Sequence, residues 1–405
     1  MILKCRCCDS DKLSSIIPLG KLPLANALLE HKTKALETKH NLEVMLCEAC
    51  GLAQLKDLID PAELFSDYVY FSSNSDAMLT SAKKLVDRII PTLSDGAFVI
   101  EVASNDGYLL KNYVNAGINV LGIDPASNIA RFANEHSVPT LCDFFSEKLA
   151  IDLAQSGKKA DIIHANNVMA HIPDLNGFVR SLKTVLKENG RVIIEMPYFL
   201  DLVKNIEFDT IYHEHVYYFS VKALRKAFER GGLELVDIEQ LVIHGGSLRL
   251  FVAHAGELKP SEIIQSMIQE EEDFGLYKLD AYHVFMQRLT ELKKKLIDTL
   301  QQLKSENAKI AAYGASAKGT TLLNYFGIGG DYIDFVVDRS IVKQGKFTPG
   351  MQLEIFAPSK LLEETITHAL LLSWNFADEI IAQQQEFIKQ GGTFIVPLPQ
   401  VKIVP

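Results

Sequence analysis

The chain has 405 residues, of which 48% are hydrophobic and 23% charged, and its formal net charge is −10. This composition is typical of a folded protein, and the negative charge argues against a nucleic-acid-binding surface, which needs a basic face. A chain of this length predicts two or three domains. No signal peptide is visible at its start and no apolar run is long enough to span a membrane, so we expect a cytoplasmic protein with no membrane partner.

Five of the six cysteines lie within the first fifty residues and supply two C-x-x-C pairs. Each pair lets two thiolates face one ion, so together they predict a tetrahedral zinc site with the ligands Cys5, Cys8, Cys47 and Cys50. Four thiolates leave no open coordination position, which indicates a structural metal. Disulfides are the alternative, which a reducing cytosol disfavours. A redox-active pair is disfavoured because neither C-x-x-C opens a helix after a strand.

The zinc module is expected to occupy residues 1–70, with Pro18, Gly20 and Pro23 interrupting any long element. The extra Cys7 is expected to point away from the metal, and the isolated Cys142 to be buried. An aromatic and hydroxyl-rich stretch over residues 65–75 is a poor core helix. After it, apolar residues at helical spacing predict a helix over 77–90, which ends before Pro91.

From residue 98 onward, apolar strand patterns alternate with helical ones. The pattern predicts strands at 98–101, 119–123, 160–166 and 191–197, and helices at 108–116, 127–135 and 177–186. Such alternation is typical of an α/β fold with a parallel sheet covered by helices on both faces. We assign residues 71–255 to this domain. Ligands of such sheets gather at the carboxyl ends of the strands.

The turn after the first of these strands, EVASNDGY over residues 101–108, predicts a nucleotide site. A second strand ends in Asp124 about twenty residues later, and a carboxylate there suits a ribose diol. The turn has Gly107 but no G-x-G-x-x-G, so it fits an adenosyl group better than a dinucleotide. We therefore predict S-adenosylmethionine as a ligand. The residues expected to contact it are Glu101, Ala103, Ser104, Asn105, Asp106, Gly107, Asp124, Asp143, Phe144 and Asn166.

The stretch Thr210 to Ser220 places His213 and His215 around Glu214, with tyrosines nearby. It is not H-E-x-x-H, so a zinc-protease site is disfavoured. Acid–base chemistry fits better, because a carboxylate can fix a histidine tautomer and a phenol can hydrogen-bond an oxyanion. A structural cluster at a domain interface is the alternative. His171, just past the end of a strand, is expected to lie over the methyl donor or to be a core histidine.

Two further patterns suit phosphate or sugar oxygens. In HGGSLR over residues 244–249, Ser247 and Arg249 offer donors, although a plain hairpin turn also explains the glycines. A charged helical region over 261–305, whose charge runs are expected to face solvent, leads to a second α/β unit within residues 256–405. Its GASAKGTT turn is not a Walker loop, yet Ser316, Lys318 and backbone amides could hold a pyrophosphate. A structural βα turn is an equally good interpretation.

With these residues in view, the chain resembles the S-adenosylmethionine-dependent C-methyltransferases that act on nucleotide-linked deoxysugars, in particular the dTDP-4-keto-sugar C-3 methyltransferases. The resemblance spans nearly the whole chain. It rests, in order, on the C-x-x-C pairs, Y-x-Y-x-S-S, E-x-A-S-N-D-G, Y-H-E-H-x-Y-Y-F-S, H-G-G-S-x-R and Y-G-A-S-A-K-G. It implies an amino-terminal zinc module, a central class I methyltransferase fold and a carboxyl-terminal Rossmann-like domain that helps to hold the nucleotide-sugar.

By the same resemblance, His215 is the general base, with Tyr212 and Glu214 beside it. His171 and either Tyr68 or Tyr70 line the sugar. The implied reaction is methylation of a sugar carbon, at C3, through an enolate in deoxysugar biosynthesis. Two alternatives stay open: an NAD-dependent sugar oxidoreductase or epimerase, and a non-catalytic zinc-bearing scaffold that binds a nucleotide-sugar.

Overall fold

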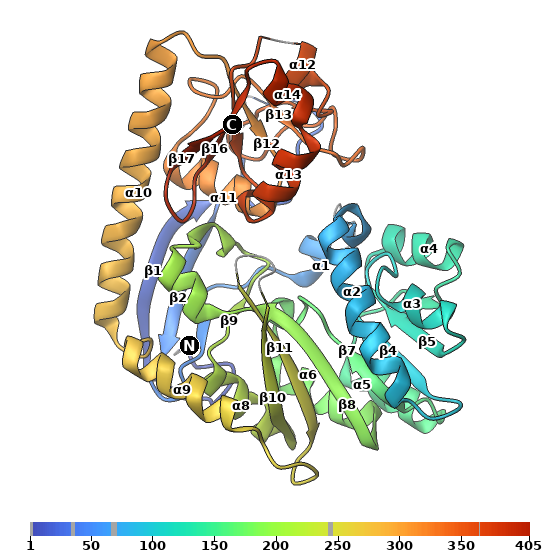
Figure 1. Cartoon of the computed structure of the whole chain (residues 1–405). Helices are drawn as coiled ribbons and strands as arrows, with labels where there is room; N and C mark the ends of the chain where they lie inside the picture. Colours follow the sequence, from blue (N-terminus) through green and yellow to red (C-terminus); the bar gives the residue numbers. More distant parts are fainter. Residues whose placement is uncertain (1–2, 34–36, 66–70, 242–245, 364) are drawn as a thin grey trace.

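The computed structural model describes residues 3–33, 37–65, 71–241, 246–363 and 365–405. Within these residues the strands form three sheets, one in each of the amino-terminal, middle and carboxyl-terminal parts of the chain. Figure 1 shows them in blue, in cyan to olive, and in orange to red. The α/β class and the three-part architecture predicted from the sequence are confirmed.

The amino-terminal sheet has the order β1-β2-β3-β9 and follows the short cysteine knuckle. Its strands are β1 (Leu13–Leu22), β2 (His40–Cys47), β3 (Ala53–Leu55) and β9 (Tyr217–Tyr218). The expectation that Pro18 and Gly20 interrupt any long element is wrong, because β1 runs through both. As an edge strand β1 tolerates a proline, and register shifts between Ser15 and Ile17 and between Pro18 and Gly20 absorb the misfit.

The middle sheet has the order β10-β11-β8-β7-β4-β5-β6. Strands β4 to β8 pair in parallel, whereas β11 is antiparallel to both β8 and β10. The strands are β4 (Phe98–Val102), β5 (Asn119–Ile123), β6 (Thr140–Leu141), β7 (Ala160–His164), β8 (Leu186–Pro197), β10 (Leu233–Leu241) and β11 (Ser247–His254). The chain passes from β4 to β5 on one side and later to β7 on the other. This reversal opens a crevice at the carboxyl ends of β4 and β7.

Helices cover this sheet, and four of them, over residues 76–89, 110–115, 127–135 and 175–185, lie close to the predicted helices. They are α2 (Asp76–Ile89), α3 (Leu110–Asn115), α4 (Ser127–Glu135), α5 (Glu147–Gln155), α6 (Leu175–Val185), α7 (Phe199–Asn205) and α8 (Val221–Gly231). Ser75, Ser146, Asp174 and Ser220 cap α2, α5, α6 and α8 by accepting a backbone N–H with their side chains. The short helix α1 (Pro61–Phe65) precedes the domain.

The charged region over 261–305 forms two helices, α9 (Glu262–Phe274) and α10 (Leu279–Ser305), separated at Gly275. Helix α10 runs past the amino-terminal sheet toward the carboxyl-terminal domain (Figure 1). The expectation that the whole acidic run faces solvent is wrong for Glu271, which is fully buried. Its carboxylate accepts hydrogen bonds from Tyr198 Oη at 3.0 Å and Val221 N at 2.6 Å, so it ties α9 to the start of α8.

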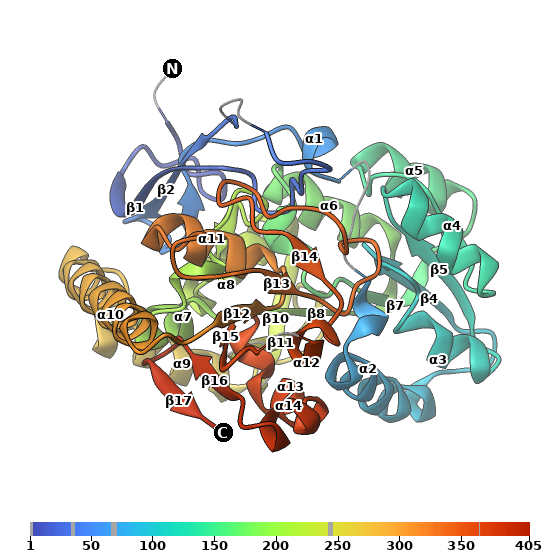
Figure 2. The same cartoon turned by 90° about the horizontal axis from the view of Figure 1, so that it is seen from above.

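The carboxyl-terminal sheet has the order β14-β13-β12-β15-β16-β17 and is parallel except for β17. Its strands are β12 (Ile310–Tyr313), β13 (Val336–Val337), β14 (Ile355–Phe356), β15 (His368–Leu371), β16 (Thr393–Val396) and β17 (Lys402–Val404). Its helices are α11 (Ala317–Phe326), α12 (Lys360–Glu363), α13 (Ala377–Gln383) and α14 (Gln385–Lys389). The strand order reverses between β12 and β15, which creates a second crevice. Seen from above, α3, α4 and α5 extend to one side of this domain (Figure 2).

Among the described residues, none of the helices combines the length and the apolar character that crossing a bilayer requires. Cys142, predicted to be buried, is exposed. It follows the two-residue strand β6, which is the edge strand of the middle sheet among the described residues.

Candidate functional site

The four predicted zinc ligands come together in the folded chain. Cys5 Sγ lies 3.6 Å from Cys50 Sγ, Cys8 Sγ lies 3.6 Å from Cys47 Sγ, and all four sulfurs lie within 4.8 Å of one another. A tetrahedral zinc with Zn–S bonds of about 2.3 Å needs sulfurs about 3.8 Å apart. The cluster therefore fits zinc, which serves a structural purpose because four thiolates leave no site for substrate. Cys7 is outside the cluster and its side chain is buried.

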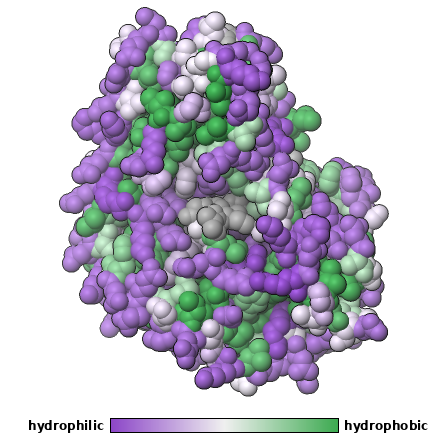
Figure 3. Space-filling model, in the orientation of Figure 1, coloured by the Kyte–Doolittle hydropathy of each residue, from purple (hydrophilic) through white to green (hydrophobic). Residues whose placement is uncertain are grey.

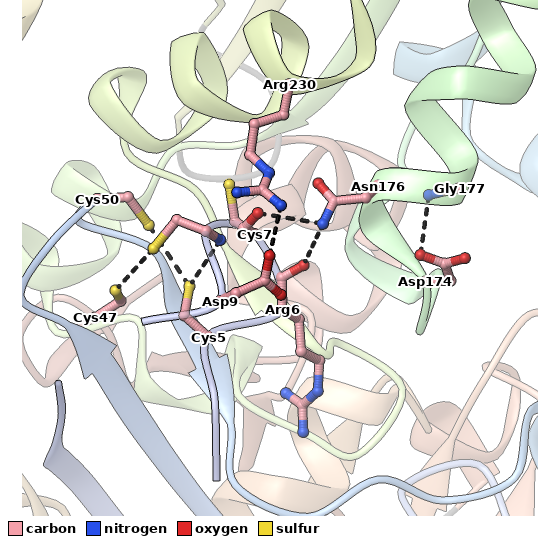
Figure 4. Close-up of polar contacts among 11 residues, drawn as sticks. Cys5, Arg6, Cys7, Asp9, Cys47, Cys50, Asp174, Asn176, Gly177 and Arg230 are labelled. Carbon is pink, nitrogen blue, oxygen red and sulfur yellow. Dashed lines mark hydrogen bonds and ion pairs between the residues drawn. The ribbon is translucent and has the colours of Figure 1, made fainter. Parts of the chain in front are cut away.

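The first knuckle is docked onto the middle domain by hydrogen bonds that Figure 4 shows. Asn176 on α6 donates from Nδ2 to the carbonyls of Arg6 at 3.1 Å and Cys7 at 3.2 Å. Asp174, two residues before Asn176, caps the same helix by accepting a hydrogen bond from Gly177 N at 2.9 Å. Asp174 and Gly177 both line the central cavity described below. The zinc knuckle thus supports one wall of that cavity.

The second knuckle leads into β3, which holds the segment that follows His215. Strand β3 pairs with β9 through Gln54 and Tyr217, and Leu55 N donates to Val216 O at 2.8 Å. Val216 N in turn donates to Ala170 O at 2.7 Å. The amino-terminal sheet is therefore completed by residues that follow His215 in the chain.

A cavity of about 890 Å³ lies between the middle and carboxyl-terminal domains. It reaches from the carboxyl ends of β4 and β7 to the turn after β12, so it joins the crevices of both sheets. The surface is indented between the two lobes formed by these domains (Figure 3). The volume of the cavity is in the range of ligand sites for drug-sized molecules.

The turn after β4 forms the end of the cavity at which the sequence predicts the methyl donor, S-adenosylmethionine. Ala103 and Asn105 adopt left-handed backbone conformations with φ of 53° and 50°, which bend the chain back over β5. Asp124 accepts hydrogen bonds from Asn105 N and Ala126 N, both at 3.0 Å. Burial raises the pKa of Asp124 to about 6. Its carboxylate is thus fixed where the ribose of an adenosyl group is expected.

The predicted cofactor residues divide into two groups. Five line the cavity, namely Ala103, Asn105, Asp124, Phe144 and Asn166. The others do not reach the lining, namely Glu101, Ser104, Asp106, Gly107 and Asp143. Glu101 lies beneath the turn, where burial and then the charges of Asp106 and Asp124 raise its pKa well above the usual range. Its Oε2 has no hydrogen-bond partner among the described residues.

Two contacts at this end were not predicted. Ser72 N donates to Asn105 Oδ1 at 2.9 Å, and Ser73 N donates to Asp106 Oδ2 at 3.0 Å. The serines of the Y-x-Y-x-S-S motif thereby hold the cofactor turn by their backbone. Tyr68 and Tyr70 of the same motif lie outside the described residues. The cavity lining, the carboxylate of Asp124 and the apolar wall at Phe144 together fit S-adenosylmethionine.

His215 and Tyr212 lie in the middle of the cavity wall. Nδ1 of His215 is 2.8 Å from the Thr210 carbonyl, which can only accept, so Nδ1 carries the proton. In the neutral ring Nε2 is then the basic atom, and it lies 2.8 Å from Tyr212 Oη. His171 packs against His215 with ring centroids 4.8 Å apart, and burial lowers the pKa of His171 to about 4. The candidate base that this wall presents to the cavity is therefore Nε2 of His215, next to the Tyr212 hydroxyl.

The hypothesis that a neighbouring carboxylate fixes the tautomer of His215 is wrong, because the Thr210 carbonyl does so. The Glu214 side chain instead lies behind the lining, where its Oε1 accepts from Asn26 Nδ2 at 2.7 Å. Burial raises the pKa of Glu214 to about 7. His213 also lies away from the cavity, with Nε2 3.2 Å from the His40 carbonyl. Tyr212 and His215 thus face the cavity, whereas the two residues between them point away from it.

The turn after β12 forms the other end of the cavity. Gly314 has φ of +96°, and a Cβ there would lie 2.3 Å from Ser373 Oγ, so only glycine fits. Ser316 caps α11 by accepting from Gly319 N at 3.1 Å. Lys318 Nζ lies 4.8 Å from the ring centroid of Trp374 and, like Ser316, lines the cavity.

Two more cations that the sequence analysis did not single out, Arg339 and Lys343, line the same end of the cavity. Lys343 is buried and donates to Ala315 O at 2.9 Å. Asp338 accepts from Ala315 N at 2.8 Å and so closes the turn from the side of β13. Arg339 lies 3.7 Å from Glu379 and Lys343 lies 3.6 Å from Asp338, so this end of the cavity holds two ion pairs and Lys318 beside a capped helix.

Ser247 and Arg249 do not lie at the cavity. Arg249 is buried in β11, where Nε is 2.7 Å from Glu195 and Nη1 is 3.0 Å from Glu239. Its guanidinium is therefore occupied by two carboxylates inside the middle sheet. Ser247 is buried where β11 pairs with the end of β8.

Comparisons with known proteins agree with this geometry. Three family models match successive parts of the chain: "Putative zinc binding domain" over residues 5–65, "Methyltransferase domain" over 76–238 and "C-methyltransferase C-terminal domain" over 242–399. The C-methyltransferase NovU of Streptomyces niveus is 34% identical over 407 residues, covering 99% of this chain and 96% of that protein.

Weaker similarities cover smaller parts of the chain. A ubiquinone biosynthesis O-methyltransferase of Ralstonia nicotianae is 29% identical over 99 residues, 24% of this chain and 42% of that protein. The match to a solved S-adenosylmethionine-dependent methyltransferase of Clostridium acetobutylicum covers 43% of this chain and 91% of that chain, with 14% identity and a TM-score of 0.36. A TM-score this low supports no conclusion. The full-length similarity to NovU and the three family matches do support a conclusion. The chain belongs to the S-adenosylmethionine-dependent C-methyltransferase family.

Proposed function

We propose that this C-methyltransferase transfers the methyl group of S-adenosylmethionine to a carbon, C3, of a nucleotide-linked 4-keto-deoxysugar. The observation that supports this most directly is the single cavity that joins a donor site, a histidine base and a second nucleotide-type crevice. A nucleotide-sugar is long enough to need both crevices, whereas a small free sugar is not. The C-methyltransferase name of the full-length relative supports methyl transfer to carbon, and the sequence resemblance favours this substrate class.

The nucleotide is proposed to lie at the turn after β12. Its diphosphate would receive hydrogen bonds from the ammonium of Lys318 and, through backbone N–H groups, from the turn around Ser316. Charge-assisted hydrogen bonds to phosphate are among the stronger polar contacts in proteins. With the diphosphate there, the keto-sugar would extend toward Tyr212, His171 and His215. A dTDP group is the expected nucleotide.

The chemistry follows from the geometry at His215. A carbon next to a ketone is weakly acidic, so His215 Nε2 takes the C3 proton and the C–H electron pair moves onto the C4 oxygen. Tyr212 Oη, which faces Nε2 in the free protein, then donates to that oxygen. When bound, S-adenosylmethionine supplies an electrophilic methyl group. The new C–C bond would form as the S–CH3 bond breaks and S-adenosylhomocysteine leaves, with the C4 carbonyl restored, and the imidazolium of His215 returns its proton to solvent.

The test compares His215→Ala with His213→Ala, a matched control whose ring lies outside the cavity against the His40 carbonyl. Each variant is incubated with labelled methyl donor and a panel of dTDP- and GDP-linked 4-keto-hexoses, and products are measured by mass spectrometry. Removing a catalytic base typically costs about 10²- to 10³-fold in rate. We expect that loss for His215→Ala alone, with unchanged affinity for S-adenosylhomocysteine. Equal rates for wild type and His215→Ala would contradict the assignment.

A second measurement tests the enolate without the methyl donor. In heavy water, protein and keto-sugar alone are expected to exchange the C3 hydrogen for deuterium, and His215→Ala is expected to stop the exchange. Exchange that continues in the variant would show that another group removes the proton.

A further inference from the structure

Among the described residues of the zinc module, the polar side chain that lines the cavity is that of Asn26. Neither the residue patterns nor the resemblance singles it out. It lies in the loop between β1 and β2, nearly two hundred residues from His215 in the chain. It shares the lining with Tyr212, His171 and His215.

The loop that carries Asn26 is held at several points. Leu28 N donates to Asn26 O at 2.8 Å, which closes a tight turn. Three residues beyond Asn26, Leu29 exchanges backbone hydrogen bonds of 2.9 and 2.8 Å with Phe347 of the carboxyl-terminal domain. Glu30 pairs with Lys346 at 2.8 Å. The loop thus bridges the zinc module and the carboxyl-terminal domain, and the position of Asn26 is well defined.

The side chain of Asn26 is oriented by Glu214. Its Nδ2 donates to Glu214 Oε1 at 2.7 Å, which is the hydrogen bond recorded for that buried carboxyl among the described residues. An amide that donates to a carboxyl on one side has a second N–H and a carbonyl oxygen left. No partner within the described chain is recorded for that oxygen, and Asn26 is partly exposed in the cavity. The remaining amide groups are thus available to a ligand in the cavity that His215 also lines.

We propose that Asn26 is a substrate-positioning residue: Glu214 holds its amide, and the amide carbonyl accepts a hydrogen bond from a hydroxyl or amino group of the sugar next to the reacting carbon. The inference rests on the proposed function. Glu214 then acts through Asn26, which explains why a carboxyl adjacent to the base in sequence lies behind the cavity lining. The sugar substituent that meets Asn26 would be one that donates a hydrogen bond, so a deoxy or O-methylated position there is disfavoured.

The experiment measures kcat/KM for the keto-sugar in wild type, Asn26→Ala, Glu214→Gln and the double variant. Asn41→Ala is the matched control, since Asn41 lies in the same module and also donates to a carboxylate, Asp57 at 2.7 Å, but outside the cavity. Losing one hydrogen bond to substrate and exposing its partner costs about 10- to 100-fold. We expect this loss for Asn26→Ala and less than a 2-fold change for Asn41→Ala. Affinity for S-adenosylhomocysteine is expected to stay unchanged in all variants.

The double variant distinguishes a direct contact of Asn26 with the substrate from an indirect, supporting role of Asn26. If Asn26 touches substrate, Asn26→Ala still lowers kcat/KM at least about 5-fold in the Glu214→Gln background, and the two losses are less than additive. No further loss in that background would overturn the substrate contact, and an Asn26→Ala rate like that of Asn41→Ala would overturn the whole inference. A wild type that methylates none of the keto-sugars would instead refute the proposed function, and this inference with it.

Discussion

Lys318, at the end of the cavity formed by the carboxyl-terminal domain, offers a direct test of where the nucleotide binds. Lys318 lines the cavity above Trp374, and its charge offsets the effect of burial on two carboxyl groups beneath it. Burial raises the pKa of Asp209 and raises that of Glu207 to about 7, and Lys318 opposes both shifts. Lys318→Met keeps most of the apolar stem of the side chain and removes the ammonium group. It should therefore affect an anionic ligand while leaving the shape of the cavity nearly unchanged.

The magnitude follows from the kind of contact. A hydrogen bond to a charged group contributes about 1.5–3 kcal/mol, so its loss weakens binding by about 10- to 100-fold. The assay is calorimetric titration with dTDP and, separately, with S-adenosylhomocysteine. We expect only dTDP affinity to fall in Lys318→Met, and the difference from wild type to shrink as salt is added.

A matched control separates this effect from a general loss of a lysine on an aromatic face. Lys293 Nζ lies 5.4 Å from the ring centroid of Tyr325 and donates to the Tyr325 carbonyl, but it does not line the cavity. Lys293→Met is expected to bind dTDP like wild type. Unchanged dTDP affinity in Lys318→Met, or an equal loss in both variants, would refute the reasoning that places the diphosphate at Lys318.

Further predictions concern the donor end and the zinc knuckle. Binding of S-adenosylhomocysteine should weaken as pH falls through about 6, because Asp124 becomes protonated and loses its charge for the ribose hydroxyls; titrations at pH 5 and pH 8 check this, and equal affinities would contradict it. The stability effect has the opposite sign, since a carboxyl with a raised folded-state pKa stabilises the free protein below about pH 4 and that contribution is lost as pH rises through about 6. Asn176→Ala removes two hydrogen bonds to the knuckle and is expected to lower the free energy of unfolding by about 1–2 kcal/mol and to speed zinc release to a chromophoric chelator. Asn189→Ala, on an exposed part of β8, is the control, and equal zinc release from both variants would contradict the docking argument.

Much of the fold could be predicted because its signals are local. The strand at 119–123 and the helix at 127–135 lie where the apolar periodicity predicts them. The zinc ligands could be identified because a C-x-x-C pair brings two thiolates together within four residues, wherever the chain goes between the pairs. Glu271 shows the limit of such reasoning, because a glutamate in an acidic run has no local feature that predicts its burial against α8.

The candidate site was predicted in part for a similar reason. Ala103, Asn105 and Asp124 line the cavity because the turns that carry them follow directly from strands. Arg249 is in a strand as well, but its two carboxylate partners come from Glu195 and Glu239 on neighbouring strands, and only the pairing of β11 determines that they meet it. Donor-rich motifs alone therefore do not distinguish a ligand site from an internal ion pair.

By itself, the order of residues determined the metal, the alternation of strands and helices, and the acidic turn that suits an adenosyl group, since each depends on neighbours a few positions apart. Only the tertiary structure decided which atom of His215 is basic, that Glu214 lies behind the lining, and that Asn26 meets Glu214 across nearly two hundred residues. Hydrogen-bond partners and burial set the charge and direction of a side chain. In a cavity between domains, those partners come from distant parts of the chain, and no local pattern records them.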